Sequence, residues 1–264
     1  MERDKINVII PTFKPGDYIF ECISSIENQS LQKNRYYLTI VLNGEKEPYY
    51  YKIKDYLSNI SCDAEIIYVE ERGVSNARNI AIEKTNGDYI VFVDDDDVIS
   101  SSYLEDFFRK RNENGIVVSN CLDFYDNINN SHDSFMSDAY RSLNDISRVH
   151  YSIRSIFSTC WGKLIPVKII NKSRFNKKVA IGEDCCFMLS ILPHIEYLYK
   201  SEPEGIYFIR NRVESASRKR KSMLFLARNK YYQIKDYLNN ILYFTRKNKL
   251  IYLNRLFSAI LYWK

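Results

Sequence analysis

The chain has 264 residues, 45% of them hydrophobic and 27% charged, with a formal net charge of +5. This composition excludes a disordered protein and is enough for one large α/β domain with an appendage. The six cysteines form no C-x-x-C pair and no zinc spacing, so we expect reduced thiols in the core. No run of about 18 apolar residues occurs, so we expect a protein that neither spans a membrane nor is secreted.

Charge is unevenly distributed along the chain. Residues 218–264 hold twelve Lys or Arg and one acid, a net of +11, whereas the other 217 residues hold 26 basic and 32 acidic side chains, a net of −6. A basic tail on an acidic body indicates an anionic partner for the tail. The acidic body argues against a broad nucleic-acid surface, so we expect no nucleic-acid partner.

The first hundred residues alternate between apolar strands and amphipathic helices. The pattern predicts strands at 6–10, 38–42, 65–69 and 89–93, separated by helices around 19–26, 49–57 and 77–84. Such alternation indicates a mostly parallel sheet, in which ligands sit beyond the carboxyl ends of the strands. One rim of the sheet should therefore collect the residues that follow these strands, namely Pro11, Asn43, Arg72 and Asp94.

The rest of the chain gives a more varied pattern. It predicts a helix at 102–114, a strand at 116–125, a helix at 143–157, a helix from Gly182 through Leu192, and strands at 195–199 and 205–210. The polar segment Asp126–Ser142 has no period and is expected to be a mobile loop, either an acceptor lid or a tolerated insertion. Two helices should follow, the first with an apolar stripe of Leu224, Ala227, Tyr231, Ile234, Leu238 and Ile241.

Four consecutive carboxylates, Asp94 to Asp97, follow the apolar strand YIVFV directly. Each neighbouring pair of charges about 4 Å apart repels by roughly 4 kcal/mol at an effective dielectric near 20. A divalent cation would relieve this repulsion, and Mg²⁺ or Mn²⁺ typically takes one or two carboxylates together with substrate phosphates. The alternative is an acidic turn before a helix for which Ser102 and Glu105 supply a capping-box spacing.

Several segments together resemble the family 2 glycosyltransferases of the GT-A fold, which are inverting enzymes that move a sugar from a nucleotide diphosphate to an acceptor hydroxyl. The resemblance covers residues 5 to about 217 and rests on INVIIPTF, ERGVSNARN, TNGDYIVFVDDDD, CWGKL, GED and YFIRNRVESAS. It implies an α/β, Rossmann-like fold with a mostly parallel central sheet flanked by helices. Residues 1–217 would form the catalytic domain, with a nucleotide-binding half at about 1–100 and an acceptor half at about 101–217. Residues 218–264 would form basic amphipathic helices.

On the donor side, the resemblance implies that Asp94 and Asp95 hold the uridine and ribose and that Asp96 binds a divalent ion, Mn²⁺ or Mg²⁺. It also implies a nucleoside pocket lined by Pro11, Thr12 and Phe13. For Pro11 the alternative is a plain strand terminator. The family often places an acid that reads uracil where this chain has Asn43, whose amide can still both donate and accept.

Four arginines are candidate contacts to the donor phosphates, because a guanidinium fork suits phosphate oxygens. Arg72 and Arg78 precede the acidic strand, while Arg210 and Arg212 resemble a late basic cluster of the family. A salt bridge from Arg78 to the aspartate run is compatible with that role. For the late pair, a solvated strand face is the alternative.

On the acceptor side, the resemblance implies that Asp184 is the catalytic base and that Glu183 orients the acceptor. A carboxylate at the start of a helix is also a common cap. Trp161 and Lys163 resemble the stretch beside the acceptor cleft, where an indole could stack on a sugar. Filling of the core is the alternative for Trp161.

These features predict a bacterial hexosyltransferase that uses a UDP-hexose to extend a saccharide or lipid-linked glycan at the cytoplasmic side of the membrane. A nucleotidyltransferase is disfavoured because residues 11–16 hold a single glycine. A non-catalytic nucleotide-, membrane- or nucleic-acid-binding module on a degenerate GT-A fold is the remaining rival. The basic tail would lie on an anionic leaflet, pack on the domain, or pair with a second copy.

Overall fold

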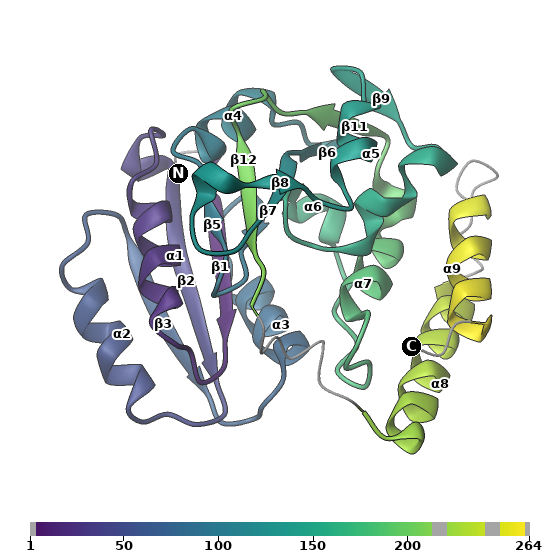
Figure 1. Cartoon of the computed structure of the whole chain (residues 1–264), viewed down its shortest axis with the longest axis horizontal. Helices are drawn as coiled ribbons and strands as arrows, with labels where there is room; N and C mark the ends of the chain where they lie inside the picture. Colours follow the sequence, from purple (N-terminus) through teal and green to yellow (C-terminus); the bar gives the residue numbers. More distant parts are fainter. Residues whose placement is uncertain (1–3, 213–220, 241–248, 262–264) are drawn as a thin grey trace.

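The computed structural model describes residues 4–212, 221–240 and 249–261. Its centre is an eight-stranded sheet in the order β3-β2-β1-β4-β10-β6-β11-β9 (Figure 1). Its strands, in chain order, are β1 (Ile6–Thr12), β2 (Tyr36–Asn43), β3 (Ala64–Val69), β4 (Tyr89–Phe92), β6 (Gly115–Val118), β9 (Ile146–Arg148), β10 (Lys163–Pro166) and β11 (Tyr197–Lys200). Only β10 and β9 run antiparallel to the neighbours they pair with. The predicted mostly parallel α/β sheet is therefore confirmed.

A second, four-stranded sheet in the order β5-β12-β7-β8 lies against the middle of the molecule. It consists of β5 (Val98–Ile99), β7 (Asn120–Phe124), β8 (His132–Asp133) and β12 (Ile206–Arg210). Because β12 pairs with both β5 and β7, this late strand brings the end of the domain back to the segment that follows the aspartate run.

Helices flank the sheets, and their apolar spacing explains their placement. The α-helices of the described ranges are α1 (Tyr18–Glu27), α2 (Tyr49–Leu57), α3 (Val74–Lys84), α4 (Tyr103–Lys110), α5 (Ser137–Arg141), α6 (Val167–Ile170), α7 (Glu183–Ile191), α8 (Met223–Asn240) and α9 (Lys249–Leu261). In α1, for example, Ile19, Cys22, Ile23 and Ile26 are all buried, as the period of the sequence predicts. Figure 1 shows α1 and α2 on one side of the molecule and α7, α8 and α9 on the other.

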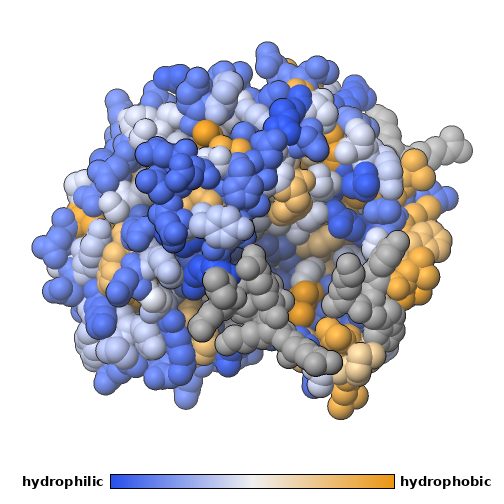
Figure 2. All heavy atoms as spheres, viewed as in Figure 1, coloured by the Kyte–Doolittle hydropathy of each residue, from blue (hydrophilic) through white to orange (hydrophobic). Residues whose placement is uncertain are grey.

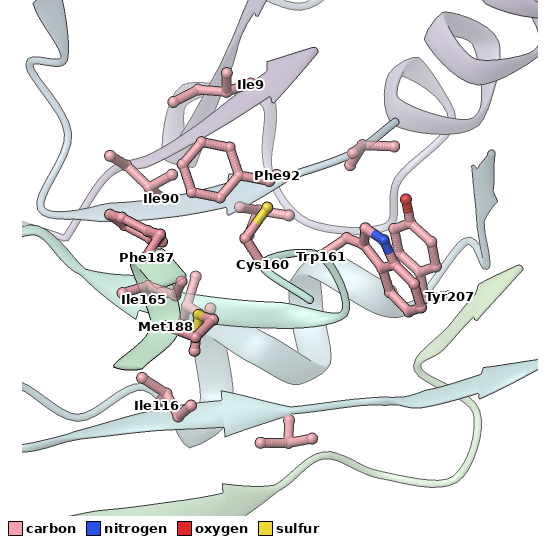
Figure 3. Packing of buried hydrophobic residues seen from close by; sticks show 14 of the residues in the cluster. Ile9, Ile90, Phe92, Ile116, Cys160, Trp161, Ile165, Phe187, Met188 and Tyr207 are labelled. Carbon is pink, nitrogen blue, oxygen red and sulfur yellow. The ribbon is translucent and has the colours of Figure 1, made fainter. Parts of the chain in front are cut away.

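The core continues across the central sheet from the N-terminal half to α7 (Figure 3). Ile9 of β1 and Phe92 of β4 lie above Phe187 of α7, whose ring stacks on Phe175 with 4.0 Å between centroids. Phe92 meets both of these rings edge-on. This aromatic cluster fixes the start of α7 relative to the end of β4, where the aspartate run begins.

Pro11 does not end the first strand. β1 continues to Thr12, and Pro11 pairs in register with Val41 of β2, whereas the pairing with β4 ends at Ile9. A proline is accepted here because it lies where only one neighbouring strand still pairs.

Two predicted elements are wrong. The segment 116–125 is two strands in different sheets, because at Ser119 the chain leaves β6, and its amide donates to Gly162 rather than to a strand partner. The segment 143–157 is not one helix but β9 followed by the 3₁₀ helix η3 (Tyr151–Ser158). Ile153, Ile156 and Phe157 are buried at spacings of three and one, which a 3₁₀ turn satisfies as well as an α-helix.

The segment 126–142 is not a structureless loop. It contains a 3₁₀ turn at Ile128–Asn130, strand β8 and helix α5. Met136 and Ser137 are fully buried, and the Tyr140 hydroxyl donates to the Ser201 carbonyl at 2.9 Å. The polar composition gave no indication of this short helix, which packs on the domain through a few buried side chains.

Helix α8 does not bury the predicted apolar stripe. Leu224, Tyr231 and Leu238 are exposed, at 81%, 59% and 47% of their surface, and Ile241 lies outside the described residues. The buried face instead carries Asn229, Gln233 and Tyr237, at intervals of four. Within the ranges given above, no helix is both long and apolar enough to cross a bilayer.

The polar face of α8 holds the loop that leads into α7. Asn229 accepts hydrogen bonds from the amides of Ala180 (2.7 Å) and Ile181 (3.1 Å), and it donates to the Ile181 carbonyl at 3.0 Å. Gln233 also donates to that carbonyl, at 2.5 Å. Gly182 follows with a φ of +79°, a left-handed conformation that favours glycine. The helices thus pack on the domain, whereas the predicted boundary at 217 falls outside the described residues.

Replacement of Asn229 by Ala should release this loop. Three hydrogen bonds of a buried amide are lost and two backbone amides remain unpaired, so the free energy of unfolding should fall by about 1–3 kcal/mol. Hydrogen exchange of the Ala180 and Ile181 amides should accelerate more than the global change explains. Asn240→Ala, which removes a bond within α8 itself, is the matched control. Unchanged exchange at both amides would contradict the clamp.

Candidate active site

The carboxyl ends of β1, β2 and β4 meet at one rim, as predicted. The Thr12 hydroxyl donates to the Asp95 carboxylate. The buried Asn43 amide donates to the Thr12 carbonyl at 2.7 Å and accepts from the Gly73 amide at 2.9 Å. Both ends of the Asn43 amide are thus engaged with the backbone, which makes it a link between two loops, and its predicted contact with the base stays a prediction.

An aromatic platform stands beside this rim. The Arg72 guanidinium lies 4.0 Å from the centroid of the half-buried Phe13 ring. A Cβ on Gly44 would come within 2.8 Å of that ring, and Gly44 has a φ of +85°, so only glycine suits the position. Pro11, Thr12, Phe13 and Arg72 are therefore neighbours, which is the arrangement that a nucleoside pocket needs.

Each carboxylate of the aspartate run has its own partner. Asp94 accepts from Arg78 at 2.9 Å, Asp95 from Thr12, and Asp96 pairs with Arg212 at 2.5 Å. The buried Asp97 accepts from the Tyr207 hydroxyl at 2.7 Å and from the Arg210 amide at 2.8 Å. The four charges are thus divided among different elements rather than gathered around one empty centre.

The run still carries an excess of negative charge. Burial, together with the neighbouring carboxylates, raises the pKa of Asp94 to about 6 against the lowering effect of Arg78. Burial also raises the pKa of Asp95 to about 7, although its hydrogen bond from Thr12 acts in the opposite direction. Desolvation disfavours the charged form of each acid.

The capping alternative for this run is not what the structure shows. Helix α4 begins at Tyr103, and the Ser102 side chain makes no capping bond to the backbone. Its hydroxyl donates to Asp106 instead, while Glu105 accepts from Ser30 and Arg109.

Arg78 is the centre of the site. Its side chain is 3% exposed, and its guanidinium reaches Asp184 at 2.5 Å, Asp94 at 2.9 Å and Glu183 at 3.3 Å. Burial alone would lower the pKa of Arg78, but the surrounding carboxylates raise it well above its usual range. The predicted salt bridge to the aspartate run is present, and the same guanidinium also binds the two acids of the GED motif. Arg78 therefore joins the two halves of the domain.

Asp184 and Glu183 lie in the first turn of α7, where the helix dipole favours negative charge. Their side chains are 14% and 15% exposed, so each keeps some access to solvent. The second Asp184 oxygen lies 3.4 Å from the Cys160 amide, which donates to it. Burial and the adjacent Asp184 raise the pKa of Glu183 to about 7. One carboxylate held by Arg78 and the Cys160 amide thus lies beside a second carboxyl group whose pKa is raised.

The two late arginines have different surroundings. Arg210 is buried, and its guanidinium binds Glu21 of α1 and donates to the Asp96 carbonyl at 2.9 Å. The alternative of a solvated strand face is therefore wrong for Arg210. Arg212 is 36% exposed and pairs with Asp96. Of the two, Arg212 has the more accessible guanidinium.

Trp161 and Lys163 lie beneath the acceptor side. The Trp161 ring stacks on Tyr207 with 5.0 Å between centroids (Figure 3). Phe135 meets the Trp161 ring edge-on. Lys163 is fully buried and donates to Thr159 and to the Trp161 carbonyl, and burial lowers its pKa to about 8. This geometry suits a support of the cleft floor, and the predicted acceptor contacts stay predictions.

The sequence reasoning missed Tyr207, Glu21 and the Cys160 amide. Tyr207 is fully buried, and its hydroxyl accepts from the Asp94 amide at 3.1 Å while it donates to Asp97. Its place within YFIRNR was a signal, because that segment was already associated with the site. No local pattern indicates Glu21, since its partner lies on a distant strand.

The residues at the rim could bind a divalent ion with a single carboxylate as the protein ligand. The described part of the chain has no group of three His, Cys, Asp or Glu side chains arranged as a complete protein cage. Mg²⁺ and Mn²⁺ do not require one, because substrate phosphates and water complete their coordination. Asp96 is the suitable ligand, since its single ion pair is with the partly exposed Arg212.

Replacement of Arg78 by Gln should be strongly destabilising. It leaves three carboxylates, which are only 14–36% exposed, without their shared cation, so the free energy of unfolding should fall by about 3 kcal/mol. The control is Arg109→Gln, which removes an exposed pair with Glu105 at 2.5 Å and should cost less than about 1 kcal/mol. Urea unfolding measures both. Equal losses would show that the Arg78 cluster contributes no more than a surface pair.

Comparison with known proteins agrees with this geometry. The model of Glycosyl transferase family 2 matches residues 7–198. Glycosyltransferase GlyA of Streptococcus pneumoniae is 28% identical over 193 residues, which cover 69% of this chain and 27% of GlyA. Poly(ribitol-phosphate) beta-N-acetylglucosaminyltransferase TarS of Staphylococcus aureus is 26% identical over 102 residues, covering 39% of this chain and 18% of TarS. The chain thus spans only about a quarter of GlyA and a smaller part of TarS.

Solved structures show the same fold. TarS residues 1–349 in complex with UDP-GlcNAc superpose with a TM-score of 0.77 at 20% identity, covering 96% of this chain and 73% of that one. Mannosyltransferase PcManGT of Pyrobaculum calidifontis in complex with GDP-Man and Mn²⁺ gives a TM-score of 0.63 at 13% identity, covering 98% and 71%. These likenesses establish a GT-A fold. With the family model matched from the first strand to β11, the chain belongs to Glycosyl transferase family 2.

Proposed function

We propose that the chain is an inverting hexosyltransferase that moves a sugar from a UDP-sugar to a hydroxyl of a cell-surface glycan or its lipid-linked precursor. The Arg78 cluster carries this proposal, because it holds Asp184 next to the end of the strand that precedes Asp94. A transferase of this kind needs its base within hydrogen-bond reach of the acceptor hydroxyl, beside the anomeric carbon of the bound donor. The UDP-GlcNAc complex of TarS supports the choice of donor.

Asp184 is suited to act as the base. One of its oxygens is fixed by Arg78 and the other receives only the long bond from the Cys160 amide, which leaves an acceptor site for a substrate hydroxyl. As that hydroxyl oxygen attacks the anomeric carbon, its proton passes to Asp184. The bond from carbon to the diphosphate breaks on the opposite face, and its electron pair leaves with the diphosphate. The configuration of the sugar is therefore inverted.

Donor binding is assigned to the opposite side of the cluster. Phe13 and Arg72 offer a platform for the nucleobase of the donor. We assign Asp94 and Asp95 to the ribose. Asp96 would hold the divalent ion, and such an ion, when bound, neutralises charge on the departing diphosphate. Arg212, released from Asp96, would then be available to the phosphate oxygens.

Two substitutions should distinguish the role of the catalytic base from that of the donor-binding site. Asp184→Asn keeps an oxygen for Arg78 but cannot take a proton, so transfer should fall by about 10²- to 10⁴-fold with UDP binding preserved. Asp96→Asn should weaken Mn²⁺-dependent UDP binding, an effect that a chelator reproduces in the unsubstituted chain. Asp63→Asn, at the exposed pair with Lys5, is the control. Binding is followed by calorimetry and transfer by product analysis. Normal transfer by Asp184→Asn would remove the base assignment.

We further propose that α8 and α9 lie against the cytoplasmic face of an anionic membrane. Figure 2 shows apolar side chains gathered over these two helices. The exposed members include Leu224, Leu238, Phe257 and Leu261, and the two helices carry five Lys or Arg against one acid, Asp236. An apolar surface edged by basic residues fits a bilayer interface. Pairing with a second copy through the same surface is the competing arrangement.

Sedimentation with lipid vesicles tests this surface. The chain should sediment with anionic vesicles at low salt and less with neutral ones, because each Lys or Arg near the surface contributes about 1 kcal/mol. Leu224→Ser combined with Phe257→Ser should abolish sedimentation, and Ile146→Ser, on the exposed side of β9, should not. If the chain is instead a dimer that does not bind vesicles, and the double variant is a monomer, the surface pairs with a second copy.

A further inference from the structure

A polar cavity of about 510 Å³ lies between α5, η3 and α9, outside the residues assigned to the donor. Two guanidinium groups and four hydroxyls line it, from Arg154, Arg255, Ser142, Ser152, Ser155 and Ser158. The volume exceeds what one small anion needs, so the carbon chain attached to that anion has room as well.

The positive charge of this cavity is not compensated from within. Neither Arg154 nor Arg255 forms an ion pair with any residue in the described ranges. The only lining carboxylate, Asp138, is already bound by Arg141 at 2.5 Å. Arg154 lies 4.5 Å from the centroid of the Tyr151 ring. A cationic cavity of this kind favours an anionic ligand.

Arg255 is held ready for such a ligand. One terminal nitrogen donates to the Arg154 carbonyl at 3.0 Å and to the Ser158 hydroxyl at 2.5 Å. Its Nε is buried and has no hydrogen-bond partner in the described part of the chain. An unpaired buried nitrogen is costly, so the protein satisfies only part of the hydrogen-bonding capacity of this guanidinium.

The donor set favours a phosphate over a carboxylate. The two lining arginines come from different elements, Arg255 from α9 and Arg154 from η3, and serines complete the polar part of the lining. A tetrahedral phosphate offers oxygens in several directions, whereas the two oxygens of a carboxylate lie in one plane.

Two lining residues lie near elements of the candidate active site. Ser158 is two residues before Cys160, whose amide donates to Asp184. Phe135, another lining residue, meets the edge of Trp161 with 6.1 Å between ring centroids.

We propose that this cavity binds a phosphate group of the acceptor, so that the acceptor is a phosphate-bearing chain. The inference rests on the proposed transferase function and narrows its substrate class. Two sources share this chemistry, a polyol-phosphate polymer and a glycan carried on a lipid diphosphate.

Calorimetry on the full chain tests the cavity without relying on turnover. The probes are a ribitol-phosphate oligomer, the same oligomer without phosphate, a uronic-acid oligosaccharide, and a short-chain lipid diphosphate glycan. Arg154→Gln and Arg255→Gln are compared with Arg109→Gln, whose guanidinium is on the exposed face of α4. Arg154→Gln is the decisive variant, because its guanidinium carries no hydrogen bond that the fold needs.

The phosphate oligomer or the lipid diphosphate should bind, and each cavity variant should raise its Kd by about ten- to a hundredfold, while UDP binding is unchanged. The probe that binds shows whether the phosphate belongs to a polyol-phosphate polymer or to a lipid diphosphate. Equal binding of the dephosphorylated or uronic-acid chain, or an unchanged Kd for Arg154→Gln, would overturn the inference. If the unsubstituted chain does not bind UDP, the proposed transferase function is wrong. Failure of the phosphate site and failure of the proposed function are therefore distinguishable.

Discussion

The buried guanidinium of Arg78 is the interaction on which the site depends. A guanidinium removed from water must recover its lost hydration from close partners, and here three carboxylates from two distant motifs provide them. Because Asp94 follows β4 and Asp184 begins α7, their shared partner sets the spacing between the donor side and the base. Burial, together with the charge of the adjacent Asp184, raises the pKa of Glu183 to about 7.

A second constraint comes from outside the catalytic fold. The loop before α7 has no neighbour in the sheet, so its amides are satisfied by Asn229 and Gln233 of α8. This explains why α8 buries a polar face and leaves its leucines exposed. The C-terminal helices thus support the loop that leads to Asp184, and they also present an exposed surface. A binding partner at the exposed face would act close to the element that carries Asp184.

The N-terminal half was predictable because its elements follow simple periods and its polar residues follow strand ends. The link between Arg78 and the GED motif could not be predicted, since it joins residues more than a hundred positions apart. In α8 the apolar period correctly predicted a helix, but it did not predict which face is buried. The buried face is the one whose polar side chains bind the loop before α7. In 143–157 the spacing of apolar residues suited a 3₁₀ helix as well as an α-helix.

The separate partners of the aspartates also change why a metal would bind. Mutual repulsion alone suggested a cation, yet Asp95 and Asp97 are held by hydroxyl and backbone donors and Asp94 by a buried arginine. Loss of Arg78 would leave Asp94, Glu183 and Asp184 without the buried cation that they share, which costs more than breaking an isolated exposed pair. Asp96 alone is paired with an arginine that water can reach. A cation on this run would therefore displace Arg212 and leave the architecture of the other three acids intact.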